Sequence, residues 1–566
     1  MKALRFAALA AAMGMAAQTA PVQAQGNAGS YLAARQARLS SDYDAAVHYY
    51  LRALGKDSNN AKLLESMVLS QIAAGETPKA VPVAQRMEKG ERPSQIAHMA
   101  LVAEEVRAGA YDAVLARLEE GRGIGPLVDG LIAAWVNIGK GDMQAALTAY
   151  NGVADQKGLT RFALYHKALA LGYVGDFEAA EAIYEGTPDQ KVQMTRRGAM
   201  ARIEVLSQLD RNDDALHLIE TLFGSDLDPA LQAIRAALAA GDTLPYTHVT
   251  SISDGVAEVF YSVAAALQTE ASHDYTLLYS RVAEYLRPDH IDALLLSAGL
   301  LEKMDHPDLA TRTYRRVPRD NPAFHAAELG RADALRKAGK VDAAIEVMQQ
   351  LAVSHGQLPV VHSTLGDLYR QQGHHIEAVA AYDKALGLYP QDDSSRWFVH
   401  YARGISNERL NHWDSAETDF RRALELNPGQ PQVLNYLGYS LVEKDRKLDE
   451  ALTMIERAAN VRPDSGYIMD SLGWVLYRLG RYEEAVGHME RATELMPVDP
   501  IVNDHLGDVY WAVGRAREAE FQWNRALSFA PEDADAERIR RKLKVGLDAV
   551  LADEGAEPLQ VARDGG

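Results

Sequence analysis

Residues 466–497 read GYIMDSLGWVLYRLGRYEEAVGHMERATELMP, and residues 500–531 read PIVNDHLGDVYWAVGRAREAEFQWNRALSFAP. The two stretches share a Leu-Gly pair, a single Gly, a small Ala and a closing Pro, in the same order and with the same spacing. Within each stretch apolar residues recur every three or four positions, which predicts two amphipathic helices joined at the single Gly. The pattern therefore predicts a helix–turn–helix unit that is repeated along the chain.

The small residue near the start of each second helix can be followed through the whole chain. It recurs with a period of about 34 residues, interrupted by one longer step between Ala215 and Thr276. The fourteen positions of the series are Ala46, Ala80, Val114, Ala146, Ala180, Ala215, Thr276, Ala310, Ala344, Ala378, Ala416, Ala451, Ala485 and Ala519. A sustained period of this length indicates stacked structural repeats, in which each unit buries its apolar face against its neighbours.

Several residue types in each repeat have a physical role in such a stack. Small residues such as Gly366 and Ala378 let paired helices approach closely, while Tyr382 and Phe420 fill the space between successive repeats. Turn residues must adopt the left-handed conformation that ends a helix, which glycine does without strain and asparagine tolerates. The residues expected in this role are Gly373, Gly480, Gly514 and Asn411. We interpret all of these residues as packing residues rather than as sites.

These residues and their spacing resemble the tetratricopeptide repeat (TPR) family, whose unit is a helix–turn–helix of about 34 residues. The match spans about residues 28–535 and is most specific between residues 359 and 535. The resemblance implies an all-α fold, namely a superhelical solenoid of about 14 helix–turn–helix repeats closed by a C-terminal capping helix. Function in such a solenoid is expected on the concave face, where protein or peptide partners bind.

The chain divides into six predicted segments. They are a signal peptide at 1–24, a divergent N-terminal TPR-like solenoid at 25–222, an irregular junction at 223–255, a C-terminal TPR solenoid at 256–535, a capping helix at 536–553 and a disordered tail at 554–566. Basic Lys2 and Arg5, a short apolar run and small residues before the cleavage position predict the signal peptide, with a retained membrane anchor as the alternative. Cleavage without a lipid anchor predicts a periplasmic protein that keeps no integral membrane segment.

Charge and composition exclude several classes of function. The chain has 59 Lys and Arg residues against 78 acidic residues, a net charge of −19 that repels phosphate backbones and anionic lipids. It has no cysteine, which excludes disulfides, thiolate metal sites and a cysteine nucleophile. The sequence contains no phosphate-binding loop, dinucleotide fingerprint or metalloprotease motif. We therefore predict a protein that is not an enzyme, with no catalytic residue, no metal, no cofactor and no nucleic-acid partner.

The candidate site is a partner-binding groove in the C-terminal repeats. On each first helix, the stripe of residues beside the packing stripe should face the groove. The predicted groove residues are Phe398, Tyr401, Asn435, Tyr439, Tyr467, Asp470, Trp474, Tyr477, Asp504, Asp508 and Trp511. Large aromatic residues are typical of binding hot spots, although several of these, Trp474 and Tyr477 especially, could instead pack between repeats. The carboxylates argue against a clamp for peptide carboxylates and favour basic or amphipathic segments.

The runs Leu434–Tyr439 and Asp470–Arg478 are similar to a subgroup of proteobacterial envelope TPR proteins. That subgroup includes lipoprotein adaptors that bind C-terminal-processing serine proteases and deliver cell-wall hydrolases to them. The resemblance implies a periplasmic scaffold that holds a protease and its clients, here without the cysteine that anchors a lipoprotein. Two alternatives stay open: an envelope glycan-active enzyme with a cryptic site, and a component of a polysaccharide or pilus export assembly.

Overall fold

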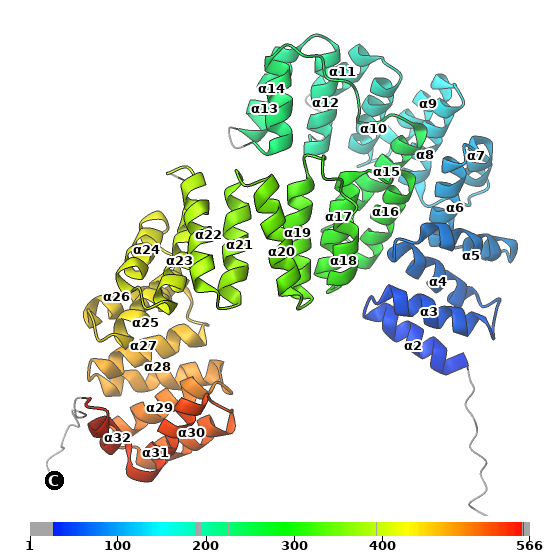
Figure 1. Ribbon diagram of the computed structural model, residues 1–566. Coiled ribbons are helices and arrows are strands. Elements are labelled where there is room, and N and C mark those ends of the chain that lie inside the picture. Colours follow the sequence, from blue (N-terminus) through cyan, green and yellow to red (C-terminus); the bar gives the residue numbers. More distant parts are fainter. Residues whose placement is uncertain are drawn as a thin grey trace, which may run out of the picture. The chain divides into compact units, whose positions relative to one another are not determined.

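The computed structural model describes residues 27–186, 192, 194–224, 227–391, 393–556 and 559. Within these residues the chain forms 31 helices, α2 to α32, and no strand (Figure 1). The predicted all-α TPR-like solenoid is confirmed. None of the described helices combines the length and the apolar character needed to span a membrane. The predicted signal peptide, and all but Glu554–Ala556 and Leu559 of the predicted tail, lie outside the described residues.

Contacts divide the chain into two compact units, Met1–Val347 and Met348–Gly566, with the boundary inside α20 (Val341–Ser354). The helices of the first unit are α2 (Asn27–Leu39), α3 (Tyr43–Leu54), α4 (Ala61–Ala73), α5 (Thr77–Lys89), α6 (Gln95–Arg107), α7 (Tyr111–Glu119), α8 (Pro126–Gly139), α9 (Met143–Ala154), α10 (Thr160–Tyr173), α11 (Phe177–Glu185), α12 (Arg196–Gln208), α13 (Asn212–Phe223), α14 (Pro229–Ala239), α15 (Ile252–Leu267), α16 (His273–Leu286), α17 (Ile291–Lys303), α18 (Pro307–Tyr314) and α19 (Phe324–Lys337). The helices of the second unit are α21 (Pro359–Gln371), α22 (His375–Leu388), α23 (Arg396–Arg409), α24 (Trp413–Leu426), α25 (Pro431–Glu443), α26 (Leu448–Val461), α27 (Gly466–Arg478), α28 (Tyr482–Leu495), α29 (Pro500–Ala512), α30 (Ala516–Ser528), α31 (Asp533–Val545) and α32 (Leu547–Asp553).

The fourteen small residues of the periodic series lie where the two helices of each pair pack closely together. Each lies in the second helix of a pair, and each has an exposed fraction of 0%. A Cβ atom added to Gly366 would lie 2.6 Å from the Tyr382 ring, so the close approach of paired helices depends on the missing side chain. The turn residues Gly373 and Asn411 adopt φ values of +75° and +62°, as the sequence predicts. These residues therefore have the packing roles expected of them.

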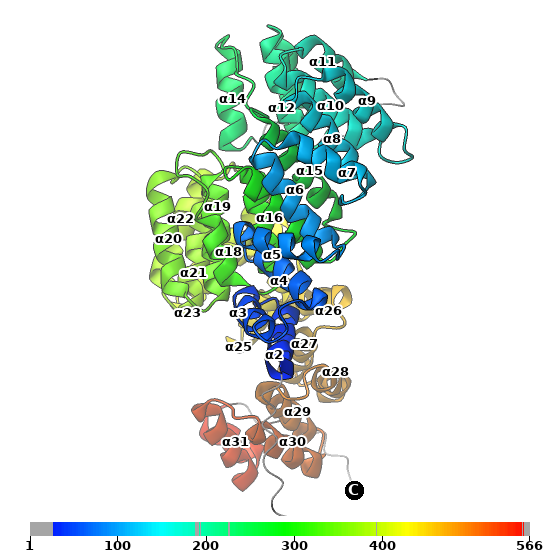
Figure 2. The same ribbon diagram turned by 90° about the vertical axis from the view of Figure 1, so that its right-hand side faces the viewer.

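The first unit is not divided at the predicted junction. Residues 223–255 contain α14, and beyond them α15 packs against α6, α8 and α10, while α16 packs against α4, α5 and α6 (Figure 2). Nine consecutive residues of α16, 276–284, are buried, so this helix is covered on every side. Its buried Arg281 donates from Nε to the carbonyl oxygen of Ala73, at 3.2 Å. Repeats on both sides of 223–255 thus belong to one compact unit, because α15 and α16 bury their apolar faces against the N-terminal helices.

Two helices cover the end of the second unit, where the sequence predicts a single capping helix at 536–553. α31 and α32 are separated by Gly546, whose φ of +82° strains any residue with a side chain. A Cβ atom at Gly546 would also lie 2.8 Å from the Trp511 ring. Ile539 of α31 and Leu547 of α32 are buried in the core of the last repeats. The two helices therefore shield the apolar end of the stack from water.

Candidate functional site

Two adjoining pockets of about 350 Å³ each lie in the second unit, along the first helices of successive repeats. Both are lined by Tyr439, Glu443 and Ile501, so they form one continuous depression, which we call the C-terminal groove. The principal lining residues are Asn435, Tyr439, Glu443, Tyr467, Asp470, Trp474, Asp504 and His505. They come from α25, α27 and α29, which follow one another in the stack (Figure 1).

Repeat spacing explains why these side chains meet. Asn435, Asp470 and Asp504 are separated by one repeat period at each step, so they occupy the same position on three successive first helices. Tyr439 and Trp474 lie four residues after Asn435 and Asp470, which places them on the same helix faces one turn further. The periodic sequence thus builds a continuous row of polar and aromatic side chains along the groove.

The aromatic residues of the groove differ in exposure. Tyr467 is 65% exposed and Tyr439 is half-buried, so both offer free ring surface to a ligand. Trp474 is largely buried, and its ring stacks on the His505 ring with 3.9 Å between the ring centres. Its Nε1 donates to Glu443 Oε1 at 2.8 Å. Trp474 therefore forms a fixed wall of the groove, while the two tyrosines are the accessible contact surface.

Polar groups of the groove include one unsatisfied acceptor. His505 Nδ1 lies 3.0 Å from Asp470 Oδ1, and both residues are buried. Burial lowers the pKa of His505, but the Asp470 carboxylate raises it further, so the net shift is upward. The Asn435 Oδ1 atom is buried and accepts no hydrogen bond from any described residue. An N–H group of a bound peptide could satisfy this acceptor.

The groove is moderately acidic. Among the described residues that line it are six carboxylates and four Lys or Arg side chains. Those carboxylates are Glu408, Glu443, Asp470, Asp499, Asp504 and Asp535, and the cations are Arg409, Lys444, Arg478 and Arg538. Together with the net charge of −19, this excess attracts cationic partners more than anionic ones.

The capping helices cover part of the predicted groove. The Lys542 side chain of α31 is fully buried, and its Nζ lies 2.7–2.8 Å from the four carboxylate oxygens of Asp504 and Asp508. Burial and the neighbouring Asp508 raise the pKa of Asp504 to about 6. Trp511 Nε1 donates to Asp548 Oδ2 of α32 at 2.9 Å. The expectation that Asp508 and Trp511 line the groove is thus corrected, because α31 and α32 occupy that surface.

Three further predicted residues also lie outside the lining of the C-terminal groove. Tyr477 is buried and stacks on Trp474, with 4.8 Å between the ring centres. Tyr401 packs against the rings of its neighbouring helices, and Phe398, which is 42% exposed, contacts the Trp397 ring. The groove therefore brings together six predicted residues: Asn435, Tyr439, Tyr467, Asp470, Trp474 and Asp504.

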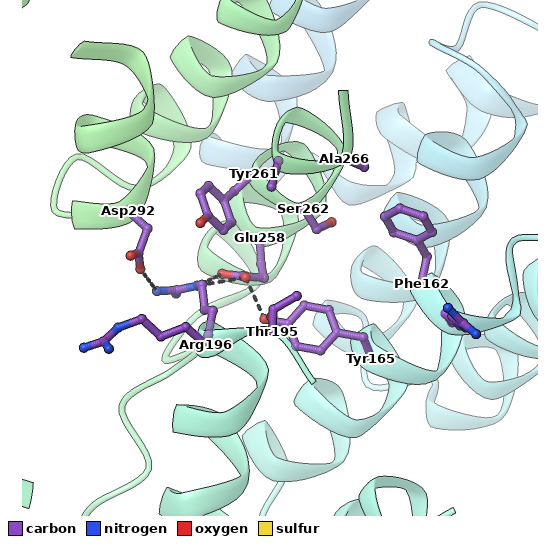
Figure 3. Close-up of a pocket in the computed structure, with 12 residues that line it drawn as sticks. Phe162, Tyr165, Thr195, Arg196, Glu258, Tyr261, Ser262, Ala266 and Asp292 are labelled. Atoms are coloured by element: carbon purple, nitrogen blue, oxygen red, sulfur yellow. Dashed lines mark hydrogen bonds and ion pairs between the residues drawn. The ribbon is translucent and has the colours of Figure 1, made fainter. Parts of the chain in front are cut away.

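A second site, which the sequence does not indicate, is a cavity of about 290 Å³ in the first unit, which we call the N-terminal cavity (Figure 3). It lies among α10, α12, α15 and the start of α17. The lining residues are Arg161, Phe162, Tyr165, Thr195, Arg196, Arg197, Glu258, Tyr261, Ser262, Ala265, Ala266 and Asp292. They are scattered along the sequence from Arg161 to Asp292 and share no motif, so no local sequence pattern identifies them as a site.

A buried carboxylate organises the N-terminal cavity. Glu258 is 1% exposed and accepts hydrogen bonds from Tyr165 Oη at 2.8 Å and from Arg197 Nε at 2.7 and 2.8 Å. His290 Nε2 lies 3.2 Å from its second oxygen. Burial raises the pKa of Glu258, but Arg197 and His290 lower it more, so the net shift is strongly downward. Arg197 Nη1 also donates to Asp292 Oδ2, at 2.6 Å.

Ser262 of the N-terminal cavity lies beside a histidine, an arrangement that invites comparison with a nucleophile and its base. His166 Nε2 lies 3.0 Å from Ser262 Oγ, and Trp135 Nε1 donates to His166 Nδ1 at 3.4 Å. Burial lowers the pKa of His166 to about 4, so the ring is neutral and carries its proton on Nε2. That N–H donates to Ser262, whose own proton goes to the Val259 carbonyl at 3.1 Å. His166 in this tautomer cannot act as a base for Ser262.

Among the described residues, no group of three or more His, Asp or Glu side chains is arranged to hold a metal ion.

Comparison with known families gives a specific result for the repeats. A tetratricopeptide repeat model matches residues 359–392, 397–430 and 467–497, and a second tetratricopeptide repeat model matches residues 295–359. The chain therefore contains tetratricopeptide repeats. The matches include α27 of the C-terminal groove, so TPR units carry part of the candidate site.

Curated relatives share part of their length with this chain. TPR repeat-containing protein PA4667 of Pseudomonas aeruginosa is 30% identical over 196 residues, 34% of this chain and 32% of the relative. Human protein O-mannosyl-transferase TMTC1 is 25% identical over 225 residues, 40% of this chain and 24% of the relative. The lipoprotein NlpI homolog of Haemophilus influenzae is 37% identical over 93 residues, 16% of this chain and 28% of the relative. This chain thus spans less than a third of each of these relatives.

A solved structure aligns over most of the chain. The APC/C hetero-tetramer Cut9–Hcn1 covers 93% of this chain and 97% of the matched chain, at 15% identity and a TM-score of 0.39.

Proposed function

We propose that this TPR protein is a scaffold that binds segments of other proteins in its C-terminal groove. The observation that carries the proposal is the pairing of accessible ring surface with an unsatisfied acceptor. Tyr467 and Tyr439 offer aromatic contact area, and Asn435 Oδ1 is buried without a donor among the described residues. A bound peptide supplies both apolar side chains for the rings and backbone N–H groups for the amide oxygen.

The chemistry of the partner follows from the charges in the groove. Asp504 and Asp470 occupy the same position in successive repeats, and Asp504 holds the ammonium group of Lys542. Helix α31 is therefore an internal example of a basic helix seated against one of these first helices, α29. We infer that the partner segment is basic and amphipathic, with Lys or Arg directed at the remaining carboxylates and apolar residues directed at the tyrosines.

We further propose that the scaffold works in the periplasm as an adaptor for a C-terminal-processing protease and its clients. Support for this finer assignment comes from the leader-like residues 1–24 and from the resemblance of Leu434–Tyr439 and Asp470–Arg478 to envelope adaptors. Similarity to a relative named as a lipoprotein is in keeping with an envelope location. In such an adaptor, simultaneous capture of protease and client raises the effective client concentration to about the millimolar range.

An envelope glycan-active enzyme is the second candidate, and the similarity to TMTC1, named as a protein O-mannosyl-transferase, is the observation that favours it. Under this alternative the purified protein transfers or hydrolyses sugars. Assays with peptidoglycan and with activated mannose donors separate the two functions, because a scaffold binds protein segments without turning over either substrate.

The decisive test of the scaffold proposal selects ligands without assuming their identity. Wild-type protein is used to select binders from a library of random peptides displayed on phage, and affinities are measured by fluorescence anisotropy. We expect selected peptides to be rich in Lys and Arg. We expect Tyr439→Ala/Tyr467→Ala to weaken their binding at least about tenfold, since each tyrosine supplies contact area typical of a hot spot.

Phe521→Ala is the matched control for this test. Phe521 is 64% exposed on α30 and does not line the groove, so the substitution removes an exposed aromatic ring of similar size. Binding by this variant should match the wild type. Equal loss in both variants, or selected peptides that are acidic, would contradict the proposal.

A further inference from the structure

The N-terminal cavity is enclosed by helices that are far apart in the sequence. Helices α10 and α12 are the first helices of successive repeats, and α15 packs against α10. The ion pair between Arg197 and Glu258 joins α12 to α15, with 2.7 Å between Nε and Oε2. The deepest lining residues, Tyr165 and Glu258, are buried, while Ala266 is exposed and marks the opening. Helix α15 thus turns a stretch of solenoid surface into a pocket of the kind that holds small molecules.

The charges around the N-terminal cavity are paired, so it offers no counter-charge to an ion. Arg197 donates to both Glu258 and Asp292. Arg196 pairs with Asp228, which lies outside the lining, with 2.5 Å between Nη2 and Oδ2. The third arginine of the lining is exposed, and water screens its charge. An ion that entered the cavity would lose its hydration without gaining an unpaired partner, so the cavity favours an uncharged ligand.

Three hydrogen-bonding groups of the lining have no partner among the described residues. The Tyr261 hydroxyl is one, and burial raises its pKa, so it keeps its proton and can donate. Arg197 uses Nε and Nη1 for carboxylates, which leaves the N–H groups of Nη2 as further donors. Its Cζ lies 5.7 Å from the centre of the Tyr261 ring, so the two side chains are adjacent. Asp292 accepts through Oδ2 only, which leaves Oδ1 as an acceptor. Neighbouring donors and an acceptor match an amide or a hydroxyl, which both accepts and donates.

The remaining walls of the N-terminal cavity are apolar. Phe162 and Tyr261 present aromatic rings from α10 and α15, and Figure 3 shows them on either side of Ser262. Ala265 and Ala266 add small apolar surface on α15. A volume of about 290 Å³ is at the lower end of the range for small-molecule sites. The walls thus suit one aromatic or aliphatic group of moderate size.

We propose that the N-terminal cavity binds a small uncharged molecule in which one aromatic or aliphatic group carries an amide or a hydroxyl. The apolar group lies between Phe162 and Tyr261, and the polar group exchanges hydrogen bonds with Tyr261 Oη and Arg197 Nη2. This site is separate from the C-terminal groove, and it takes a small molecule where the groove takes a protein segment.

Three probes of similar shape test the charge preference in ligand-observed NMR titrations of the full chain at pH 7. They are phenylacetamide, which is uncharged, phenylacetate, which is an anion, and phenethylamine, which is a cation. We expect the amide to bind at least about tenfold more tightly than either ion, which corresponds to about 1.4 kcal/mol. Equal affinities, or tighter binding of one of the ions, would overturn the proposal.

Tyr261→Phe tests the polar contact, because it removes the unpartnered hydroxyl and keeps the ring. We expect phenylacetamide to bind about fivefold more weakly to this variant, while toluene, which has no polar group, binds as it does to the wild type. Tyr49→Phe on α3 is the matched control, since that hydroxyl also has no partner among the described residues and lies outside the cavity lining. It should leave both affinities unchanged. An unchanged affinity of Tyr261→Phe for phenylacetamide would overturn the assignment of the polar contact.

Two further arms test the position and the size of the ligand. Ala265→Phe places a ring in the cavity and should abolish binding of phenylacetamide, with the melting temperature as the check on folding. Should this variant fail to fold, Tyr261→Phe carries the test. The uncharged peptide acetyl-Gly-Gly-Phe-Gly-Gly-amide should bind at least about tenfold more weakly than phenylacetamide, because the cavity holds one group of moderate size. Tighter binding of the peptide, or wild-type binding of phenylacetamide by folded Ala265→Phe protein, would overturn the small-molecule site.

Discussion

The last repeat and the one before it carry an aspartate at the same position, yet the two carboxylates have different partners. Asp504 in α29 shares the buried ammonium group of Lys542 with Asp508. Asp470 in α27 is buried beside His505 of the next repeat, and both carboxylates line the C-terminal groove. One sequence position thus pairs with a lysine of the capping helix in the last repeat and with a histidine of the next repeat in the preceding one.

The comparison shows that position within a repeat does not by itself determine function. What differs is the element that follows. After α29 the chain places α31 and α32 against that helix, where they hold Asp508 and Trp511, whereas α27 is followed by another repeat that leaves Tyr467 exposed. A residue in the groove-facing stripe is therefore available to a partner only where no later segment of the chain covers it.

The largest effect is expected from removing the cation that closes the last repeat. Lys542→Ala removes the nearest counter-charge of Asp504 and Asp508 and leaves only Arg538, whose Nη1 lies 4.0 Å from Asp504 and 3.6 Å from Asp508, so we expect a loss of about 3 kcal/mol of unfolding free energy. Urea denaturation monitored by tryptophan fluorescence measures the loss. Lys544→Ala, an exposed lysine on the same helix, is the control and should change stability by less than about 0.5 kcal/mol. Equal stability of the two variants would show that the ion pairs of Lys542 with Asp504 and Asp508 do not stabilise the last repeat.

A second prediction separates packing from binding among the aromatic residues. Trp511→Ala removes a ring that donates to Asp548 and contacts Trp523, and we expect it to cost about 2 kcal/mol of stability. Affinity for a library-selected peptide should stay within about twofold of wild type. The two quantities are measured by denaturation and by anisotropy on the same preparation. A tenfold loss of affinity with native stability would instead place Trp511 in the groove.

The smallest effect concerns pH. The pKa of His505 is lowered by burial but raised more by Asp470, so its folded-state value lies above the unfolded one. The stabilisation from this pair is complete below the unfolded pKa of about 6.5 and is lost as pH rises through the folded value. The stability difference between wild type and Asp470→Asn should therefore be larger at pH 6 than at pH 9. Thermal unfolding at both pH values checks this, and a difference independent of pH would contradict it.

The fold was largely predictable because the repeat signal is local. Small residues such as Ala46 and Ala519 identify pairs of helices that are neighbours in the sequence. All fourteen small residues of the periodic series are buried in the helix pairs expected. The hydrogen bond of Arg281 to Ala73, by contrast, joins two helices that are far apart in the sequence. The repeat period does not indicate contacts between helices that are distant in the sequence, so the packing of α15 and α16 on the N-terminal helices was not predictable.

The candidate site was predictable only in part, for a related reason. Helical spacing identifies Asn435, Tyr439 and Asp470 as neighbours because each repeat has the same geometry. The amphipathic pattern of the capping segment predicts that it covers the last repeat, but not that Lys542 reaches Asp508. Side-chain pairing across a covered surface depends on three-dimensional placement, which a one-dimensional pattern does not contain.

The most direct measurement of the central claim is photo-crosslinking of a library-selected basic peptide that carries benzoylphenylalanine, with the crosslinked residues identified by mass spectrometry. The account predicts crosslinks on α25, α27 and the start of α29, centred on Tyr439 and Tyr467, and none on the outer helices α26, α28 and α30. Crosslinks confined to those outer helices would contradict the claim that the C-terminal groove is the partner site.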